Sequence, residues 1–277
     1  MNADVRQPLG EVVARGTRSS IHAYGAGAVI KVPHLSTPTD WILAEAGYTE
    51  AVRAVGAPVP RLLGIKRIDG RPASVWERIE GASMWQHISE QPQLSGALGE
   101  LLAEIQLGLF ALLPPLTLPN QRDRLVSKIR TSATTFEPSL AGALDVVPPL
   151  VSPLRLCHGD LHPSNVILSD KGPVIVDWFD ASRGDPVADV ARTLLTMRGD
   201  GSAGPQHLPG SDGRTLEALS DAYLARLRAS LALDDALLAR WQAVQAVARM
   251  AEGVSRDVLR DVWNGYDEPA LQAAVAS

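Results

Sequence analysis

The chain has 277 residues, a length that suits one two-lobed domain or two closely packed domains. Hydrophobic residues make up 45% of it and charged residues 21%, proportions that fit a folded globular protein and exclude a disordered one. The formal net charge is −5, which argues against a nucleic-acid-binding protein, because such proteins are usually basic.

The single cysteine, Cys157, cannot form an internal disulfide, which suits a reducing compartment. The N-terminus has no basic segment followed by an apolar one, so we expect no signal peptide. We find no run of about 18 apolar residues, the length that a membrane-spanning helix requires. These features predict a cytoplasmic protein that binds neither membranes nor nucleic acid.

The first 80 residues alternate between short apolar runs and turn residues. Residues 11–32, broken by Gly16 and by Gly25–Gly27, predict three strands, and residues 58–81 predict two more, turned at Asp69–Gly70. A helix is expected between them, capped by Thr39 or Asp40 and ending near Val55. Its expected buried face is Ile42, Leu43, Ala46 and residues 48–52.

From residue 83 onward the pattern is mainly helical. Leucine and isoleucine recur at helical spacing over residues 98–112 and stop at Pro114–Pro115, which predicts one long helix. Further helices are predicted within 120–143 and at 186–198, 214–231 and 235–253. Residues 199–213 are rich in Gly, Pro and Ser and are expected to form a loop. We place a hinge near 76–82, between a lobe of residues 1–80 and a lobe of residues 81–277.

Residues 158–165 read HGDLHPSN, and residues 174–180 read VIVDWFD. Transfer of a phosphoryl group from ATP to a hydroxyl requires a proton acceptor, oxygen ligands for Mg²⁺ and a cation on the phosphates. Asp160 can accept the proton, and Asn165 and Asp177 can offer oxygens to the metal. The order base, Asn, Asp matches that of a kinase catalytic loop and its metal-binding aspartate. The alternative is a polar turn between strands.

These two motifs, together with ASRGDPVADVARTL after them, resemble the aminoglycoside phosphotransferase family, which has a protein-kinase-like fold. The resemblance implies an α+β, bilobal fold with a small N-terminal five-stranded antiparallel sheet and one helix, and a larger, mainly helical C-terminal lobe. It also implies ATP as phosphoryl donor, with GTP not excluded, and Mg²⁺. By this resemblance Asp160 is the catalytic aspartate, and Asn165 and Asp177 are the metal ligands.

The nucleotide-binding residues are carried over by position. Lys31 in VIKVP lies where the family has its phosphate-pairing lysine, with Glu45 as its expected partner and Glu50 as the competitor. The segment RGTRSS, residues 15–20, lacks the G-x-G-x-x-G pattern, so Ser19 and Ser20 are the expected phosphate contacts. Glu77 and Ile79 are expected to present their backbone carbonyl and N–H to adenine.

Four other polar residues of these motifs have proposed roles. The resemblance implies that His158 braces the loop and that Asp189 hydrogen-bonds to it. His162 falls where protein kinases have a lysine that steadies the γ-phosphate, so we expect it to be a second catalytic residue beside Asp160. The alternative, equally open, is that it only braces the loop. Asp185 before Pro186 is expected to cap a helix.

Two departures from protein kinases bear on the substrate. Gly159 replaces the arginine that reads activation-loop phosphorylation, and DWF replaces DFG, with no peptide-docking segment after it. We therefore expect O-phosphorylation of a small-molecule hydroxyl and no protein substrate. The alternatives are an inactive nucleotide-binding pseudokinase, and a metabolic choline-type or sugar-type kinase in place of an antibiotic-modifying enzyme that confers resistance.

The acceptor site is expected on residues 120–143 and on the last helices. There Gln245, Arg249, Glu252 and Arg256 form a polar stripe, which is either a solvated face or a substrate-lining one. Acidic residues could receive a cationic acceptor: Asp180, Glu252, Asp257, Asp267 and Glu268. Because the stripe mixes charges, we expect a neutral or weakly cationic acceptor.

Overall fold

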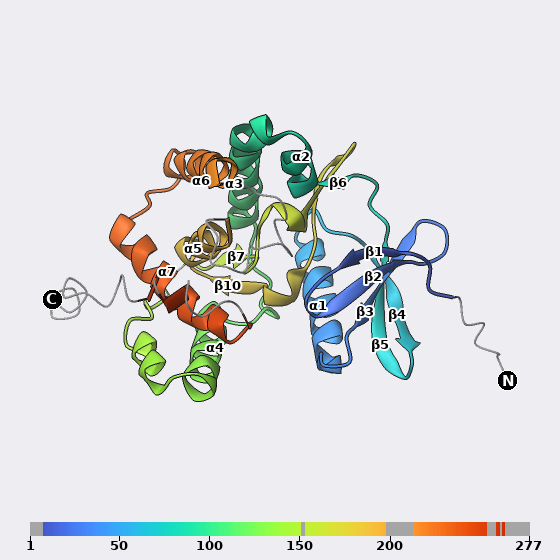
Figure 1. The fold of residues 1–277 in the computed structure, drawn as a ribbon, viewed down its shortest axis with the longest axis horizontal. Coiled ribbons are helices and arrows are strands. Elements are labelled where there is room, and N and C mark those ends of the chain that lie inside the picture. The colour runs from blue at the N-terminus through green and yellow to red at the C-terminus, as the bar shows by residue number, and fades with distance from the viewer. Residues whose placement is uncertain (1–7, 151–152, 198–212, 254–258, 261, 264–277) are drawn as a thin grey trace. The chain divides into compact units, whose positions relative to one another are not determined.

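The structure is a computed structural model that describes residues 8–150, 153–197, 213–253, 259–260 and 262–263. The chain folds into two compact units. Unit 1 comprises Met1–Ala82 and Ile167–Asp180, and unit 2 comprises Ser83–Val166 and Ala181–Ser277. In Figure 1 the elements labelled β1 to β5 and α1 belong to unit 1, and those labelled α2 to α7 belong to unit 2.

Unit 1 contains an antiparallel sheet of five strands in the order β1-β2-β3-β5-β4. The strands are β1 (Val12–Arg15), β2 (Ser19–Ala23), β3 (Ala28–Pro33), β4 (Leu62–Ile68) and β5 (Arg71–Glu77). Positive φ angles at Asp69 (51°) and Gly70 (79°) make the tight turn between β4 and β5. Ile30, Ala73 and Val75 form the core of the sheet with Ala28. The predicted five-stranded antiparallel sheet is confirmed.

The single helix of this sheet, α1, runs over Thr39–Ala54. Its N-cap residue is Pro38, and no side chain caps the first turn, so the predicted cap at Thr39 or Asp40 is wrong. Ile42 and Ala46 are buried as expected, but Leu43 is 51% exposed. The polar Glu45 is buried instead, because it forms an ion pair with the sheet.

A second segment, residues 167–180, completes unit 1. It contains most of β8 (Val166–Ser169), β9 (Gly172–Ile175) and the 3₁₀ turn η4 (Trp178–Asp180), and a three-stranded sheet has the order β6 (Ala82–Ser83), β8, β9. The N–H of Ile175 donates to the carbonyl of Pro58 (2.7 Å). The indole of Trp178 is fully buried and donates to the Ile175 carbonyl (3.0 Å).

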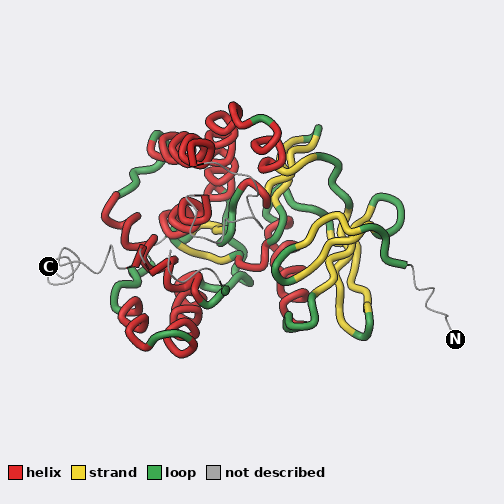
Figure 2. Tube along the Cα trace, viewed as in Figure 1, coloured by secondary structure: helices red, strands yellow, loops and turns green. Residues whose placement is uncertain are grey.

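Unit 2 is mainly helical (red in Figure 2), with one antiparallel pair of short strands. Its α-helices are α2 (Met84–Glu90), α3 (Ser95–Ala111), α4 (Gln121–Thr135), α5 (Pro186–Met197), α6 (Gly213–Arg228) and α7 (Asp235–Met250). The 3₁₀ turns are η1 (Pro92–Leu94), η2 (Pro138–Leu144) and η3 (Pro163–Asn165). The paired strands are β7 (Arg155–Cys157) and β10 (Ser182–Gly184). The helices predicted after residue 83 are therefore confirmed, while residues 199–212 of the predicted loop lie outside the described part.

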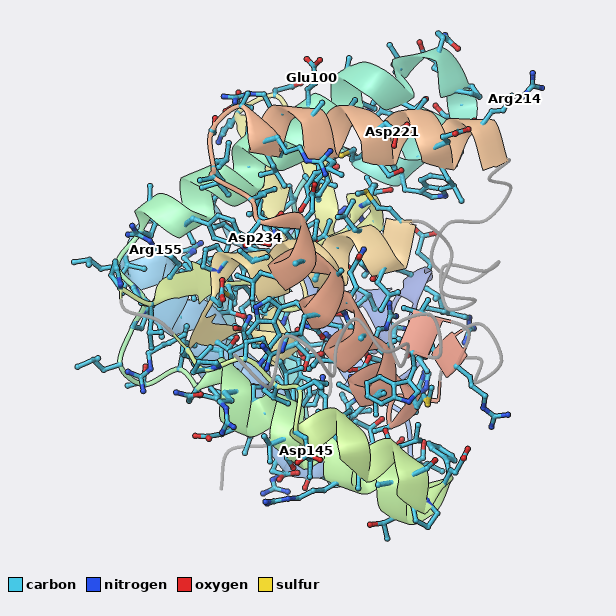
Figure 3. The ribbon with its side chains drawn as sticks, turned by 90° about the vertical axis from the view of Figure 1, so that its left-hand side faces the viewer. Glu100, Asp145, Arg155, Arg214, Asp221 and Asp234 are labelled. Carbon is cyan, nitrogen blue, oxygen red and sulfur yellow. The ribbon has the colours of Figure 1, made fainter. Side chains whose placement is uncertain are left out.

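Capping side chains fix where α5 and α7 begin, as they also do for α2 and α4. The carboxylate of Asp185 accepts from the N–H of Val187 (2.8 Å), which confirms the predicted cap of α5. Asp234, labelled in Figure 3, caps α7 by accepting from the N–H groups of Ala236 and Leu237. Both ends are set by local sequence chemistry.

Helices α3 and α6 lie side by side; Figure 3 labels Glu100 on α3 and Arg214 and Asp221 on α6. The helices approach closely at Gly99, where an added Cβ would lie 2.3 Å from the carbonyl oxygen of Leu219. By length and composition the stretch Pro92–Ala111 could cross a membrane, a test that buried core helices also pass. Leu102 and Leu109 of α3 are buried within unit 2.

Candidate functional site

The ammonium of Lys31 lies between two carboxylates within unit 1. Lys31 is on β3, and its Nζ lies 2.6 Å from Oε1 of Glu45 on α1 and 3.0 Å from Oδ1 of Asp177. The competing partner, Glu50, pairs with Arg53 instead (3.0 Å). Lys31 and Glu45 are nearly buried, whereas the Asp177 side chain is 46% exposed. This geometry leaves one side of the cluster open to solvent.

Burial and the neighbouring charges shift the pKa values of this cluster in opposite directions. Burial alone would lower the pKa of Lys31, but the carboxylates of Asp177 and Glu45 raise it above its ordinary value. Burial raises the pKa of Glu45 to about 7, although Lys31 opposes that shift. Lys31 therefore stays a cation at physiological pH and can neutralise a phosphate.

Asp177 has an unusual backbone. It follows β9 and has φ of 65°, the left-handed region that aspartate tolerates better than most residues. Residues held in this region are found frequently at active sites and ligand clamps. The two residues after it are tightly packed: Trp178 is buried, and Phe179 stacks on Trp41 of α1 at a centroid distance of 4.6 Å. The backbone that carries the carboxylate is thus held by the packing of the residues that follow it.

Arg18, in the turn between β1 and β2, packs against aromatic residues of α1 and η4. The guanidinium of Arg18 lies 4.7 Å from the ring centroid of Trp41 and 5.7 Å from that of Phe179. Ser19 and Ser20 are buried at the start of β2, and a hydrogen bond of 2.8 Å joins the Ser20 hydroxyl to His22. The predicted phosphate contacts therefore lie in the strand directly after the turn.

The two residues expected to bind adenine lie at the end of β5. Glu77 is the last residue of β5, and Ile79 follows two residues later. The side chain of Glu77 accepts from the N–H of Arg61 (2.9 Å), which holds the end of the strand to the segment before β4. Their backbone contacts to adenine stay a prediction.

In unit 2 the loop 158–165 follows β7 and is anchored by Asp189 of α5. The N–H groups of His158 and Gly159 donate to the two carboxylate oxygens of Asp189, at 3.1 and 2.7 Å. The side-chain amide of Gln106 donates to the same carboxylate (2.9 Å). Asp189 is 1% exposed, so this anchor is rigid and buried. The expected hydrogen bonding of Asp189 to the loop is confirmed.

The loop also braces itself. The N–H of Asp160 donates to Nδ1 of His158 (3.2 Å), and the side-chain amide of Asn165 donates to the carbonyl of Asp160 (2.9 Å). His162 is 3% exposed, and its Nε2 lies 3.9 Å from Oδ2 of Asp160. The contact of His162 with the γ-phosphate stays a prediction, and so does its loop-bracing alternative.

The carboxylate of Asp160 forms an ion pair with Arg192 of α5. Nη2 and Nε of Arg192 lie 3.0 and 3.3 Å from Oδ1 of Asp160. Burial alone would raise the pKa of Asp160, but Arg192, His162 and Arg249 hold it well below its usual range. Asp160 is therefore ionised at neutral pH, as a proton acceptor must be.

The comparison with protein-family models decides the family. The model described as the phosphotransferase enzyme family, APH, matches residues 15–233, more than half of the chain. The chain belongs to this family. No curated protein sequence matches it.

The fold of this APH chain is shared with solved structures. An aminoglycoside-3′-phosphotransferase of type VIII has a TM-score of 0.64 at 21% identity, over 87% of this chain and 93% of that one. An aminoglycoside phosphotransferase from Streptomyces rimosus, solved with ADP and streptomycin, has 0.58 at 20%, over 83% and 90%. An amicoumacin kinase, solved with AMP-PNP, Ca²⁺ and Ami, has 0.58 at 15%, over 95% and 89%. These likenesses show the protein-kinase-like fold.

The residues expected to hold Mg²⁺ belong to different units, Asn165 to unit 2 and Asp177 to unit 1, and their binding of the ion stays a prediction. Mg²⁺ at nucleotide sites is bound through one or two protein oxygens together with phosphates and water. The amide nitrogen of Asn165 donates to a carbonyl, so its oxygen is the atom left for a ligand. Among the described residues no three or more His, Cys, Asp or Glu side chains are grouped so that they could hold a metal ion.

Sequence reasoning missed Arg192 and misjudged Glu252. Arg192 lies in the DVAR segment of a buried helix, and an arginine in such an apolar context was the available signal. Glu252, expected to receive a cationic acceptor, instead lies 2.6 Å from Lys128 and 2.8 Å from Arg192. Gln245 and Arg249 are buried, so this part of the polar stripe is not a solvated face. Arg256, Asp257, Asp267 and Glu268 lie outside the described residues.

Proposed function

We propose that this APH protein is an ATP-dependent O-phosphotransferase that acts on a hydroxyl of a small molecule. The observation that carries the proposal is the loop that contains Asp160, which Asp189 anchors by accepting from two backbone N–H groups. A fixed, charged carboxylate is the group that accepts the hydroxyl proton in this reaction. The Lys31–Glu45–Asp177 cluster supports a nucleotide site in the same chain.

In the proposed reaction each part has one task. Asp160 accepts the proton of the acceptor hydroxyl, and Lys31 contacts the α- and β-phosphates while Glu45 holds its ammonium. Asn165 and Asp177 are the proposed ligands of Mg²⁺, which when bound neutralises charge on the phosphates. Ser19 and Ser20 support the phosphates, Glu77 and Ile79 receive adenine through their backbone, and His162 braces the loop. GTP is the alternative donor.

Two observations bear on the acceptor. The carboxylate of Glu252 is bound by Lys128 and Arg192, and Asp180 is 8% exposed. A polycationic acceptor needs several carboxylates that converge on it, and these two residues do not offer that. We therefore propose a neutral or weakly cationic acceptor. We also propose a cytoplasmic location, where ATP and reducing conditions suit the buried thiol of Cys157.

The test is a transfer assay with purified protein, Mg²⁺ and ATP labelled at the γ-phosphate. Aminoglycosides, macrolides, peptide antibiotics, amino alcohols, choline and simple sugars are offered, together with a generic peptide. We expect labelled phosphate on a small molecule that is neutral or weakly cationic. Transfer to polycationic aminoglycosides alone would overturn the acceptor ranking, and transfer to the peptide alone would overturn the function.

Asp160→Asn is the matched variant for this assay, because it removes the charge and keeps the shape. We expect kcat to fall by roughly 10²–10⁴, the usual contribution of a positioned general base, with little change in ATP affinity. A pseudokinase would bind nucleotide and show no transfer in either protein. Growth of cells that express the chain, in the presence of each antibiotic acceptor, then separates a resistance enzyme from a metabolic one.

A further inference from the structure

Arg192 is shared between two carboxylates of unit 2. Its Nη2 and Nε face Oδ1 of Asp160 at 3.0 and 3.3 Å. Its Nη2 and Nη1 also face the two oxygens of Glu252, at 2.8 and 3.3 Å. The planar guanidinium suits this arrangement because its donors point in fixed directions. One arginine therefore joins the loop 158–165 to the turn that follows α7.

The group around Arg192 is buried. The side chains of Arg192 and Glu252 are 3% and 9% exposed, and Lys128 of α4 lies 2.6 Å from Glu252. Arg249 lies 3.7 Å from Glu252 and donates to the hydroxyl of Thr196. Buried charges of this kind persist only when their partners hold them in good geometry, and the loss of one partner is strongly destabilising. The position of the guanidinium is thus set by its own helix, α5, by Glu252 in the turn after α7 and, through Glu252, by Lys128 of α4.

The two oxygens of the Asp160 carboxylate are consequently not equivalent. Oδ1 receives both hydrogen bonds from Arg192. Oδ2 lies 3.9 Å from Nε2 of His162, a separation that is beyond hydrogen-bonding distance. A carboxylate held at one oxygen presents the other in a fixed direction, and such orientation is a large part of catalysis.

We propose that Arg192 is a positioning residue that takes Oδ1 of Asp160 and so directs Oδ2 toward the acceptor hydroxyl, and that Glu252 and Lys128 hold Arg192 in place. The inference rests on the proposed function. In that reaction the hydroxyl proton goes to Oδ2, the acceptor oxygen bonds to the γ-phosphorus, and the bond from the γ-phosphorus to the β-phosphate oxygen breaks to leave ADP. Glu252 acts on this step without touching the reacting atoms.

The first test compares the kinetics of Arg192→Ala, Arg192→Lys and Glu252→Gln with those of the wild type. We expect Arg192→Ala to lower kcat about a hundredfold, the effect of a misplaced catalytic group, and to leave KM for ATP within about twofold. Added guanidinium chloride at low millimolar concentration should restore part of that kcat. Arg192→Lys and Glu252→Gln should fall between Arg192→Ala and wild type. Arg228→Met removes an exposed arginine paired with Asp235 and should behave as wild type.

A second test does not depend on any acceptor. It measures the Tm of wild type, Asp160→Asn, Arg192→Met and the double variant. We expect the Tm of the double variant to be no lower than that of Arg192→Met, because the ion pair between Asp160 and Arg192 is already lost in each single variant. Labelling of the buried Cys157, next to the loop, reports whether the loop has unfolded in any variant.

The outcomes separate the two claims. Wild-type protein that transfers phosphate to no acceptor contradicts the proposed function, whatever the Tm values show. Active wild type, together with an unchanged kcat in Arg192→Ala or with additive Tm shifts, overturns the positioning role. A loss of kcat that guanidinium does not restore, in protein whose Cys157 has become reactive, also overturns it and assigns Arg192 a purely structural role.

Discussion

Single residues in this chain are tuned by what lies within a few ångströms of them. Glu45 and Glu50 are on the same helix, five positions apart, yet one is buried against Lys31 and the other is paired with Arg53 at the surface. Burial raises the pKa of Glu45 to about 7, while the hydrogen bond from Arg53 lowers the pKa of Glu50. Their opposite shifts make the two residues a matched pair for experiment.

We expect Glu45 to make the protein less stable as pH rises. The pKa of an unfolded glutamate is about 4.3, and the folded value is about 7, so the folded protein binds this proton more tightly. The contribution to the free energy of unfolding is complete below the unfolded pKa and is lost as pH rises through 7. In wild type without nucleotide, the free energy of unfolding measured with urea should fall by on the order of 2–3 kcal/mol between pH 5 and 8. In Glu45→Gln this fall should be absent.

Glu50→Gln is the control on the same helix. Because the pKa of Glu50 is lowered, its contribution is already complete above the unfolded pKa and is lost only in more acidic solution. Its difference from wild type should not change between pH 5 and 8. If the free energy of unfolding changed with pH in the same way in wild type and Glu45→Gln over this range, the raised pKa of the buried Glu45 would be contradicted.

The thiol of Cys157 should be inert in the folded protein. It is fully buried, and burial raises its pKa well above the usual range, so little thiolate is present to react. We expect Ellman's reagent to label less than about a tenth of the thiol within minutes at pH 8, and all of it in guanidinium chloride. Rapid labelling of native protein would show that β7 opens easily.

At the scale of elements, short polar contacts hold the loop 158–165, and close apolar packing holds the helices behind it. Asp189 of α5 accepts from two backbone N–H groups of the loop, and Gln106 of α3 donates to the same carboxylate. The hydroxyl of Tyr223 on α6 donates in turn to the side chain of Gln106. The packing of α3 on α6 therefore bears directly on the loop 158–165.

We expect Gly99→Ala to destabilise the protein because there is no room for a methyl group. An added Cβ would lie 2.3 Å from the carbonyl oxygen of Leu219, which is backbone and can move only if α6 moves. Overpacking of this kind costs about 1–3 kcal/mol. Thermal unfolding should show a lower Tm for this variant.

Gly108→Ala is the matched substitution on α3. Gly108 is exposed, and nothing lies within 4 Å of an added Cβ. The change should stabilise the helix by about 0.5–1 kcal/mol through backbone entropy. Equal Tm values for the two variants would show that α3 and α6 do not meet at Gly99.

At the scale of the whole molecule, unit 1 is built from two segments far apart in the chain. Residues 167–180 supply the buried Trp178, the stacked Phe179 and the carboxylate that binds Lys31. An added Cβ at Gly81 would lie 2.3 Å from the carbonyl oxygen of Leu168, so the two segments touch where the first one ends. Part of the packing of unit 1 therefore comes from its second segment.

We expect a fragment of residues 1–82 to fold poorly and a fused version to fold better. Joining residue 82 to residues 167–180 through a short Gly/Ser linker restores the packing of Trp178 and Phe179 on α1. Amide hydrogen exchange should show slower exchange in β3 and α1 of the fused fragment than in residues 1–82 alone. Equal exchange in both fragments would contradict this division of the chain.

The sequence by itself determined the order of the elements and the chemistry of the motifs. The turn at Asp69–Gly70, the cap at Asp185 and the stop after α3 follow from residues a few positions apart, where turn and capping preferences act. The chemistry of the HGDLHPSN loop could likewise be predicted, because its polar side chains are close together in the sequence. Local signals of this kind need no knowledge of packing.

Only the tertiary structure decided which distant residues meet. Asp160 pairs with Arg192 across 32 positions, Arg192 with Glu252 across 60, and Lys31 with Asp177 across 146. No periodicity encodes such pairings, because they depend on which helix faces are buried together and on the cost of leaving a buried charge without a partner. The same cause buried Glu45 while exposing Leu43, and turned Glu252 from an expected acceptor contact into the partner that holds Arg192.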